Sequence, residues 1–331
     1  MKKSLIKTTF YATAIAFTLL SFTSCSDDDE NSTMMDDKPM TIGAFVETNQ
    51  NYSSLNAALI ATDLKSVTTD NNQNITVFAP DNTAFSAFLS AKGFANGLAD
   101  VDTPEEIALV KNILLNHVIL DNEVKASSVV STAPAYIKNA AMGPKDVANQ
   151  DTHISLFYDV VEGDVLLNGK VTVTTPDAYD ATNGIIHAVD QVIDLPMIST
   201  FVVADARVSI LKEKLIETQL VAPVDNQNPA TVFAPLNAAF SALESVPSGS
   251  TLENILKYHV ISGANAVASD LPNLRSNTPE TLQGQTIAIT STNSIQGNDN
   301  TDAANFVIND IQAANGVIHV IDKVLLPNMD K

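Results

Sequence analysis

The chain has 331 residues, of which 45% are hydrophobic, with no tryptophan and one cysteine. At about 150 residues per domain this length predicts two domains, and a lone cysteine excludes a disulfide within the chain. The formal net charge of −20 repels phosphate backbones, so we expect no nucleic-acid partner.

The N-terminus has the layout of a secretory signal. Three lysines precede a mostly apolar run over residues 10–22, which is too short to span a bilayer. Residues 22–25 read FTSC and resemble a lipobox, the site at which a bacterial lipoprotein is cleaved and its new N-terminal cysteine is acylated. We therefore predict a signal peptide over 1–24 and membrane attachment through lipidated Cys25. An ordinary signal peptide cleaved nearby is the alternative.

An acidic segment follows this cysteine directly. Residues 26–30 read SDDDE and resemble the surface-export signal of some Gram-negative lipoproteins, while a solvated spacer is the alternative reading. We predict a lipidated acidic tether over 25–39 and a location on the outer membrane, facing the exterior. A periplasm-facing orientation is the alternative.

Two copies of one long pattern occupy the rest of the chain. The copies read TVFAPDNTAF at 76–85, ILLNHVI at 113–119 and NGIIHAVDQVIDLP at 183–196, then TVFAPLNAAF at 231–240, ILKYHVI at 255–261 and NGVIHVIDKVLLP at 315–327. The order is the same but the intervals shorten, so the insertions lie between the motifs, as loops vary around a fixed core. This predicts one domain over 40–196 and a second over 197–331.

Each copy is expected to begin with a helix and a buried strand. Apolar residues recur at helical spacing at Phe45, Tyr52, Leu55 and Leu59, and again at Phe201, Val208, Leu211 and Leu215. The TVF segment then predicts a short buried strand, because it is rich in β-formers and ends at a proline. Asn82 and Asn237 follow where a helix N-cap belongs, so we expect them to cap the next helix.

The later half of each copy has the alternation of β-strands. Strands are predicted over 153–160 and 170–175, with Asn168-Gly169 as a tight turn before the second of them. Residues 286–290 and 306–308 take these parts in the second copy. A final strand follows an Asn-Gly turn, formed by Asn183 and Gly184 or by Asn315 and Gly316. Helices early and strands late predict an α+β fold.

The three motifs together resemble the fasciclin domain, which carries a TVFAP stretch, a late NG-x-I-H-x-I-D stretch and a Tyr-His pair between them. The resemblance implies two tandem fasciclin-like domains, each with N-terminal helices packed against a mixed β-wedge, and a role in extracellular adhesion without shared catalytic residues. The Tyr-His region of the family is linked to adhesion, and Tyr258 and His259 match it. These two are therefore candidate interaction residues, unless the tyrosine packs inside the domain.

The recurring histidines invite a catalytic or metal-binding interpretation, which we reject. His117, His259, His187 and His319 are only two per copy, whereas zinc needs three or four converging ligands. Asp190 and Asp322 stand three residues after a histidine, on the opposite face of a strand, which argues against a His-Asp dyad. Catalytic and cofactor motifs are absent from the sequence, so we expect structural histidines, no enzyme activity, no cofactor and no metal.

Two loops rich in Asp and Asn, at 70–74 and 297–305, could supply oxygen ligands for calcium. Neither fits the EF-hand spacing, and such residues also simply form turns. We therefore predict no calcium site.

The predicted function is noncovalent binding of an unknown extracellular protein or glycan on a surface, matrix or host. The alternative is glycan capture by an accessory lipoprotein in nutrient uptake. Sparse aromatic residues, 6% of the chain with no tryptophan, count against that alternative, since sugar platforms commonly use aromatic faces.

Overall fold

The computed structural model describes residues 39–226, 229–276 and 280–328. The predicted signal peptide, Cys25 and the acidic segment lie outside these residues. Pro39 onward forms one compact unit. Within the described part of the chain, no helix combines the length and apolar character needed to cross a bilayer.

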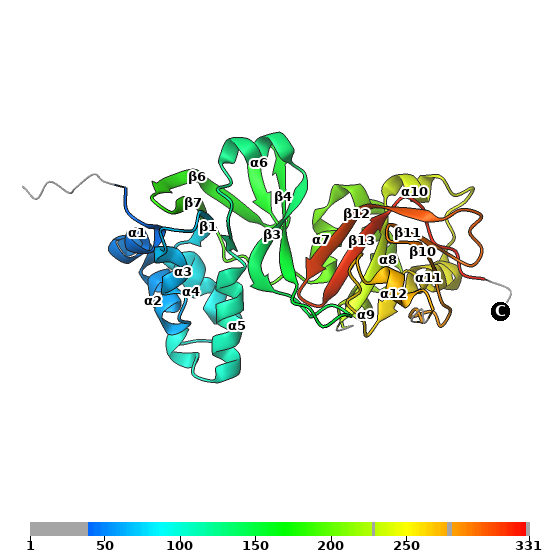
Figure 1. The fold of residues 1–331 in the computed structure, drawn as a ribbon, viewed down its shortest axis with the longest axis horizontal. Helices are drawn as coiled ribbons and strands as arrows, with labels where there is room; N and C mark the ends of the chain where they lie inside the picture. The colour runs from blue at the N-terminus through cyan, green and yellow to red at the C-terminus, as the bar shows by residue number, and fades with distance from the viewer. Residues whose placement is uncertain (1–38, 227–228, 277–279, 329–331) are drawn as a thin grey trace, which may run out of the picture. The chain divides into compact units, whose positions relative to one another are not determined.

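The first domain places its helices mainly before its strands, as predicted for an α+β fold (Figure 1). Its helical elements are α1 (Ile42–Thr48), the 3-10 turn η1 (Gln50–Tyr52), α2 (Ser53–Ala61), α3 (Lys65–Thr69), α4 (Asn82–Ala91), η2 (Gly97–Asp100), α5 (Pro104–Leu115) and α6 (Ala126–Thr132). Its strands are β1 (Ile75–Pro80), β2 (Val118–Ile119), β3 (Ala135–Met142), β4 (His153–Val161), β5 (Asp164–Leu167), β6 (Val171–Ala181) and β7 (Gly184–Val189).

The second domain repeats most of this order. Its helical elements are α7 (Ile198–Ala204), η3 (Ala206–Val208), α8 (Ser209–Glu217), α9 (Val221–Asp225), α10 (Asn237–Ser241), α11 (Gly249–Tyr258) and α12 (Leu271–Leu274). Its strands are β8 (Ala230–Pro235), β9 (Val260–Ser262), β10 (Ala288–Ser291), β11 (Ser294–Gln296), β12 (Ala304–Ala313) and β13 (Gly316–Ile321).

The two sheets share the same strand order at the end that holds the TVF strand and the final strand. The first has the order β2-β1-β7-β6-β5-β4-β3 and the second β10-β11-β12-β13-β8-β9. In each sheet the TVF strand pairs in parallel with the final strand, β1 with β7 and β8 with β13, while the remaining pairs are antiparallel. Each sheet is therefore a mixed wedge, and the central TVF strands are buried at every position.

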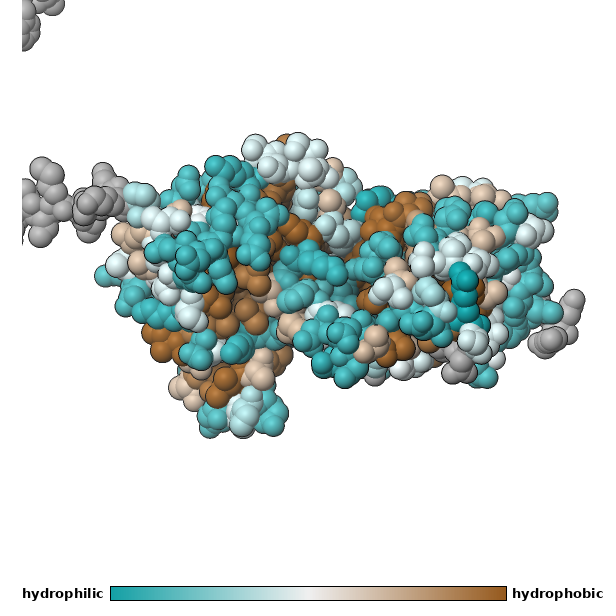
Figure 2. All heavy atoms as spheres, in the orientation of Figure 1, coloured by the Kyte–Doolittle hydropathy of each residue, from teal (hydrophilic) through white to brown (hydrophobic). Residues whose placement is uncertain are grey.

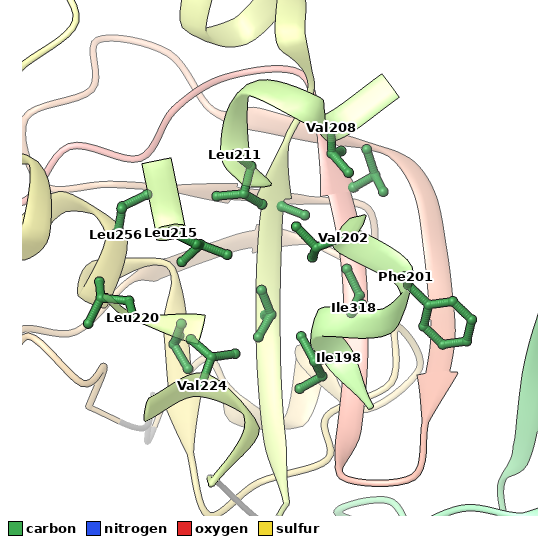
Figure 3. Close-up of a cluster of buried hydrophobic side chains, with 14 of the residues drawn as sticks. Ile198, Phe201, Val202, Val208, Leu211, Leu215, Leu220, Val224, Leu256 and Ile318 are labelled. Atoms are coloured by element: carbon green, nitrogen blue, oxygen red, sulfur yellow. The ribbon is translucent and has the colours of Figure 1, made fainter. Parts of the chain in front are cut away.

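The core of each domain lies where the first helices cover the central strands. In the second domain, Val202 from α7, Leu211 and Leu215 from α8 and Ile318 from β13 converge on β8 (Figure 3). Burial at these positions is nearly complete. The predicted helical spacing therefore does mark the core-facing residues of the first helices.

The prediction of one opening helix per domain was wrong. The chain forms a helix, a 3-10 turn and a second helix in each copy, broken at Asn49 and at Asp205. Both side chains accept a hydrogen bond from the backbone N–H two residues later, at 3.0 Å from Asn51 and 2.9 Å from Arg207. Such local bonds compete with helix hydrogen bonding, so the break recurs at equivalent positions.

The predicted turns occur where the sequence places them. Asn168 and Gly169 have φ values of 50° and 67° between β5 and β6, which is the left-handed conformation of a tight hairpin turn. The face seen in Figure 2 is mostly hydrophilic with apolar side chains interspersed, as expected for a protein whose sheets are buried.

Candidate functional site

The histidines of the HVI motifs are interior hydrogen-bonding residues. His117 Nε2 accepts a hydrogen bond from the Ile193 N–H at 2.8 Å, so its proton lies on Nδ1, which donates to the Ile113 carbonyl at 2.8 Å. His259 repeats both bonds with Leu325 and Ile255, at 2.9 and 2.7 Å. Burial lowers the pKa of each ring to about 4, because desolvation disfavours the charged form. Each neutral ring ties a helix to the end of its domain.

The histidines of the NG motifs use the opposite tautomer. His187 Nδ1 accepts from the Asp177 N–H at 3.0 Å and Nε2 donates to the Val124 carbonyl at 2.8 Å. His319 makes the matching bonds with Asp310 and Ala266, at 3.4 and 2.9 Å. Burial lowers both pKa values. All four rings therefore have both nitrogens engaged by backbone groups.

The carboxylates near the rings of His187 and His319 are not those of Asp190 and Asp322, which the sequence analysis considered. Asp177 and Asp310 lie 3.6 and 4.0 Å from the Nδ1 atoms of His187 and His319. Their carboxylates also accept from the Ala126 and Ala268 N–H groups, at 3.0 and 2.7 Å. Sequence reasoning missed both, although the two copies each carry an aspartate shortly before the Asn-Gly turn.

Asp190 and Asp322 instead join neighbouring strands. Asp190 accepts from the Thr172 N–H at 2.8 Å, and Asp322 accepts from the Asn305 N–H at 2.7 Å. Among the described residues, the histidine ion pairs involve Asp177 and Asp310 and not these two aspartates. The described part of the chain holds no group of three or more His, Cys, Asp or Glu side chains arranged for a metal ion.

The threonine of each TVF strand is hydrogen-bonded to the segment that follows the two- or three-residue strand β2 or β9. Sequence reasoning missed this contact. Thr76 Oγ1 donates to the Asn122 carbonyl and accepts from the Val124 N–H, both at 2.8 Å. Thr231 does the same with Ala264 and Ala266, at 2.8 and 2.9 Å. The recurrence of this threonine inside an otherwise apolar strand was the available signal.

The Asn-Gly turns hold the first helix of each domain. Asn183 Oδ1 accepts from the Ile42 N–H at 2.9 Å, and its amide donates to the Thr68 carbonyl at 3.0 Å. Asn315 Oδ1 accepts from the Ile198 N–H, also at 2.9 Å. Each asparagine is buried and satisfies an orphan amide at a helix N-terminus.

The prediction that Asn82 and Asn237 are N-caps was wrong. Asp81 caps α4 by accepting from the Ala84 N–H at 2.8 Å, while Asn82 is the first helical residue. Asn82 accepts from the Ser54 N–H and donates to the Gln50 carbonyl, both at 2.8 Å. Asn237 repeats this pair of bonds with Ile210 and Ala206, each at 2.9 Å. The recurring asparagine therefore joins two helices, which explains why position 81 can be leucine in the second copy.

Tyr258 and His259, the candidate interaction residues, lie inside the second domain. Tyr258 is 0% exposed and His259 is 2% exposed. The Tyr258 hydroxyl donates to the Thr286 carbonyl at 2.8 Å and accepts from the Asn298 N–H at 3.2 Å. Its partner position Asn116 is also buried and donates to the Ile193 carbonyl at 3.0 Å. The packing interpretation fits these contacts, and neither side chain offers a surface to a partner.

The Asp- and Asn-rich loops use side chains for hydrogen bonds to the backbone. Asp70 Oδ1 accepts from the Asn72 N–H at 2.9 Å. Asn300 donates to the Val324 carbonyl at 2.9 Å and accepts from the Leu326 N–H at 2.8 Å. The Asp70 bond is that of a turn-forming residue, whereas Asn300 fastens its loop to the segment that follows β13.

An open groove of about 670 Å³ lies between α4 and the end of β7 in the first domain. Lys92 pairs with Asp194 at 2.8 Å and lies 5.4 Å from the centre of the Phe88 ring. Asp81 and Lys170 also line the groove, so its walls carry both signs of charge beside one aromatic ring. This surface depression offers polar and charged groups to a binding partner.

The two domains contact each other through β3 and β4 of the first. The Tyr136 hydroxyl donates to Asp205 Oδ2 at 2.9 Å, and Arg207 pairs with the same carboxylate at 2.7 Å. Phe157 from β4 joins the core of the second domain, and the Gln312 N–H donates to Ser155 Oγ at 3.0 Å. Apolar and polar contacts thus fasten one domain to the other.

Comparison with known proteins finds relatives across bacteria, fungi and animals. A fasciclin-like arabinogalactan protein of Arthroderma benhamiae is 26% identical over 275 residues, which are 79% of this chain and 60% of that protein. Periostin of Homo sapiens is 31% identical over 182 residues, which are 50% of this chain and 20% of periostin. The chain thus spans about a fifth to three fifths of these relatives' lengths.

A solved structure and a family description complete the comparison. The FAS1 domain pair of the insect cell adhesion molecule Fasciclin I matches with a TM-score of 0.47 at 18% identity, covering 87% of this chain and 97% of that one. The fasciclin domain description matches residues 50–196 and again 206–327. Together these two segments hold most of the chain, which therefore belongs to the fasciclin domain family.

Proposed function

We propose that this chain is a lipid-anchored extracytoplasmic protein that binds a surface, matrix or host component noncovalently. Its two fasciclin domains carry the proposal, because fasciclin family members are adhesion proteins and not enzymes. The buried, doubly bonded histidines support a noncatalytic role: none has a ring nitrogen available for proton transfer or metal binding.

The proposed anchor is Cys25, and its substitution tests it. Cys25→Ser removes the acylated thiol, so the protein should move from the membrane fraction to the soluble envelope fraction. Two or more acyl chains anchor a protein stably to a membrane. The polypeptide without them loses that membrane affinity. Retention on membranes, after a salt wash, of a C25S protein from which the signal peptide has been removed would contradict lipid anchoring at this residue.

The proposed location outside the cell is tested by protease shaving of intact producing cells. Loss of the protein while a periplasmic control survives is the expected result. Protection until the envelope is opened would place it in the periplasm, where adhesion between cells is untenable. An envelope-internal binding role would then replace the adhesive one.

The groove beside α4 is the proposed binding surface. Lys170 is exposed there and can meet a carboxylate of a partner, so Lys170→Glu should weaken attachment of producing cells to matrix-coated surfaces. Lys138→Glu is the matched control, since Lys138 is exposed on β3 away from the groove. Equal attachment by both variants would exclude the groove. Saturable binding of wild type to one polysaccharide on an array, with no binding to protein coats, would favour glycan capture instead.

A further inference from the structure

The segment that enters α6 in the first domain is held to the sheet by two neighbouring side chains, His187 of β7 and Asp177 of β6. His187 Nε2 donates to the Val124 carbonyl at 2.8 Å. Asp177 Oδ1 accepts from the N–H of Ala126, the first residue of α6, at 3.0 Å. Lys125, the N-cap residue of α6, makes no side-chain cap bond of its own. The Asp177 carboxylate therefore takes the place of a cap for this helix.

The same two side chains also contact each other. His187 Nδ1 accepts from the Asp177 backbone N–H at 3.0 Å, and the Asp177 carboxylate lies 3.6 Å from the same nitrogen. Asp177 has a φ of 49°, within the bulge of β6. This left-handed conformation is uncommon for a residue other than glycine. In it, one residue presents both its amide and its carboxylate to one ring nitrogen.

Protonation of the His187 ring sets these contacts against one another. The neutral Nδ1 accepts the Asp177 N–H, whereas a protonated Nδ1 is a donor and has no lone pair left for that bond. The Asp177 carboxylate, 3.6 Å away, is the nearby anion that can receive the new N–H. It is already bonded to Ala126. The imidazolium and the start of α6 therefore compete for one carboxylate, while the backbone bond from Asp177 to the ring is lost.

Other charged groups around the ring are engaged with one another or lie beyond it. On the β1 side, His187 stacks on the uncharged Phe78 ring, with 5.4 Å between ring centres. The remaining titratable side chains around the ring and the start of α6 are Glu123, Lys125, Asp180 and Tyr158. Glu123 and Lys125 pair with each other at 3.1 Å, and the Tyr158 hydroxyl is bonded to a threonine of α6 at 2.9 Å. Asp177 is therefore the carboxylate that acts on this ring directly.

Acid favours release of these contacts. Burial lowers the pKa of His187, while the Val124 carbonyl and Asp177 partly offset the decrease. A ring freed from its buried contacts regains the ordinary pKa of about 6.5. As pH falls below that value, the released state takes up a proton that the closed state does not. The population of the released state therefore rises by up to about tenfold per pH unit.

We propose that Asp177 and His187 form an acid-sensitive latch on α6: at neutral pH they hold the start of the helix, and protonation of His187 releases it. The matching residues of the second domain are a weaker version. Asp310 lies 4.0 Å from His319 Nδ1 and accepts from Ala268, which precedes α12 without starting it. The latch is separate from the proposed adhesive groove, which lies on other residues.

The test is an NMR titration of the full chain from pH 7 to pH 5. The Ala126 amide signal should move with the same midpoint as the ring signals of His187, and its protection from hydrogen exchange should fall below that midpoint. Asp177→Asn keeps an acceptor for Ala126 but removes the anion that attracts the ring proton, so the midpoint should move to lower pH. Asp310→Asn is the matched control and should leave both signals of the first domain unchanged.

Three results would overturn the latch. The Ala126 signal could stay fixed while His187 titrates, which would show that ring and helix are not linked. Asp177→Asn could leave the midpoint where wild type has it, which would remove the carboxylate from the device. The ring could also stay neutral until the chain unfolds as a whole. The first and third results come from wild type alone, so they decide the matter even if Asp177→Asn does not fold.

Discussion

The glycine that opens each final strand is fixed by close contact with the neighbouring strand. Gly184 has a φ of 139° and Gly316 a φ of 151°, which L side chains rarely adopt. A Cβ atom at either position would overlap the carbonyl oxygen of Ile75 or Ala230. The parallel pairing of the TVF strand with the final strand therefore requires glycine there.

Gly184→Ala should destabilise the protein by at least about 3 kcal/mol, because the added methyl group cannot fit without moving β1. Gly163→Ala is the control, since Gly163 has a φ of 99° but no atom within 4 Å of its added Cβ. That variant should cost about 1 kcal/mol from the backbone conformation alone. Urea unfolding measures both, and equal losses would contradict the steric argument.

The buried neutral histidines make stability depend on pH. Free imidazoles titrate near 6.5, whereas the pKa of His117 and His259 is about 4 in the folded chain. As pH falls below 6.5, the unfolded chain takes up protons that the folded chain does not, so stability decreases until about pH 4. The loss at pH 5 should be about 2 kcal/mol for each of these two rings.

Unfolding free energies measured in urea at pH 7, 6 and 5 test this dependence. His153→Asn should keep the whole slope, because His153 is exposed. An unfolding free energy that stays constant from pH 7 to pH 5 would mean that the four buried rings are not held neutral.

The Tyr-His pair is tested by two substitutions. Tyr258→Phe loses two hydrogen bonds of the hydroxyl and should cost about 1–2 kcal/mol, while Tyr258→Ala also leaves a cavity and should cost about 3–5 kcal/mol. Attachment of cells should follow stability, with Tyr258→Phe retaining it. Loss of attachment in a stably folded Tyr258→Phe would restore a direct polar role.

At the scale of elements, the recurring asparagine after the TVF strand lies at a helix start without capping that helix. The TVFAP motif predicted a strand, a proline stop and a helix, and all three are present. The asparagine lies at the helix start but bonds to the preceding pair of helices. The junction between α2 and α4, and its counterpart between α8 and α10, is therefore a polar contact at the edge of an apolar core.

Asn82→Ala should destabilise the first domain more than removal of the true cap. It leaves the Ser54 amide and the Gln50 carbonyl without their partner, at a cost of about 2 kcal/mol, against about 1 kcal/mol for Asp81→Ala. Thermal unfolding of both variants gives the comparison. A larger loss for Asp81→Ala would show that the cap matters more than the junction between helices.

For the whole molecule, the contact between domains centres on Tyr136 of β3. Tyr136 is packed against Phe157 and Phe201, with ring centres 4.9 and 5.6 Å apart, and its hydroxyl is bonded to Asp205. Burial raises the pKa of this tyrosine. A buried aromatic cluster with satisfied polar groups favours unfolding of the two domains as one unit.

Tyr136→Ala should separate the unfolding of the two domains. The variant removes the ring and leaves Asp205 with one partner fewer, so calorimetry should show one transition in wild type and two in the variant. Tyr179→Ala is the control, because Tyr179 stacks on Phe45 within the first domain, with 4.1 Å between ring centres. Its loss should lower the stability of the first domain without weakening the contact between domains. Two transitions already present in wild type would contradict coupling through this contact.

Local sequence patterns alone were enough to predict much of this protein. The repeat, the α+β order, the TVF strands and the Asn-Gly turns depend on residues close together in the chain, where periodicity and turn chemistry act directly. The same patterns predicted the family. They also predicted core-facing positions such as Leu55 and Leu211, because helical spacing reports which face is buried.

The tertiary structure decided which partners the polar residues meet. His187 and Val124, Asn82 and Ser54, and Tyr136 and Asp205 are bonded although many residues separate them. Such pairs depend on how elements fold back on one another, which no local pattern encodes. The equivalence of Val173 on β6 and Phe306 on β12 is of the same kind: it follows only from the register of their strands, and that register exists only in the folded sheets.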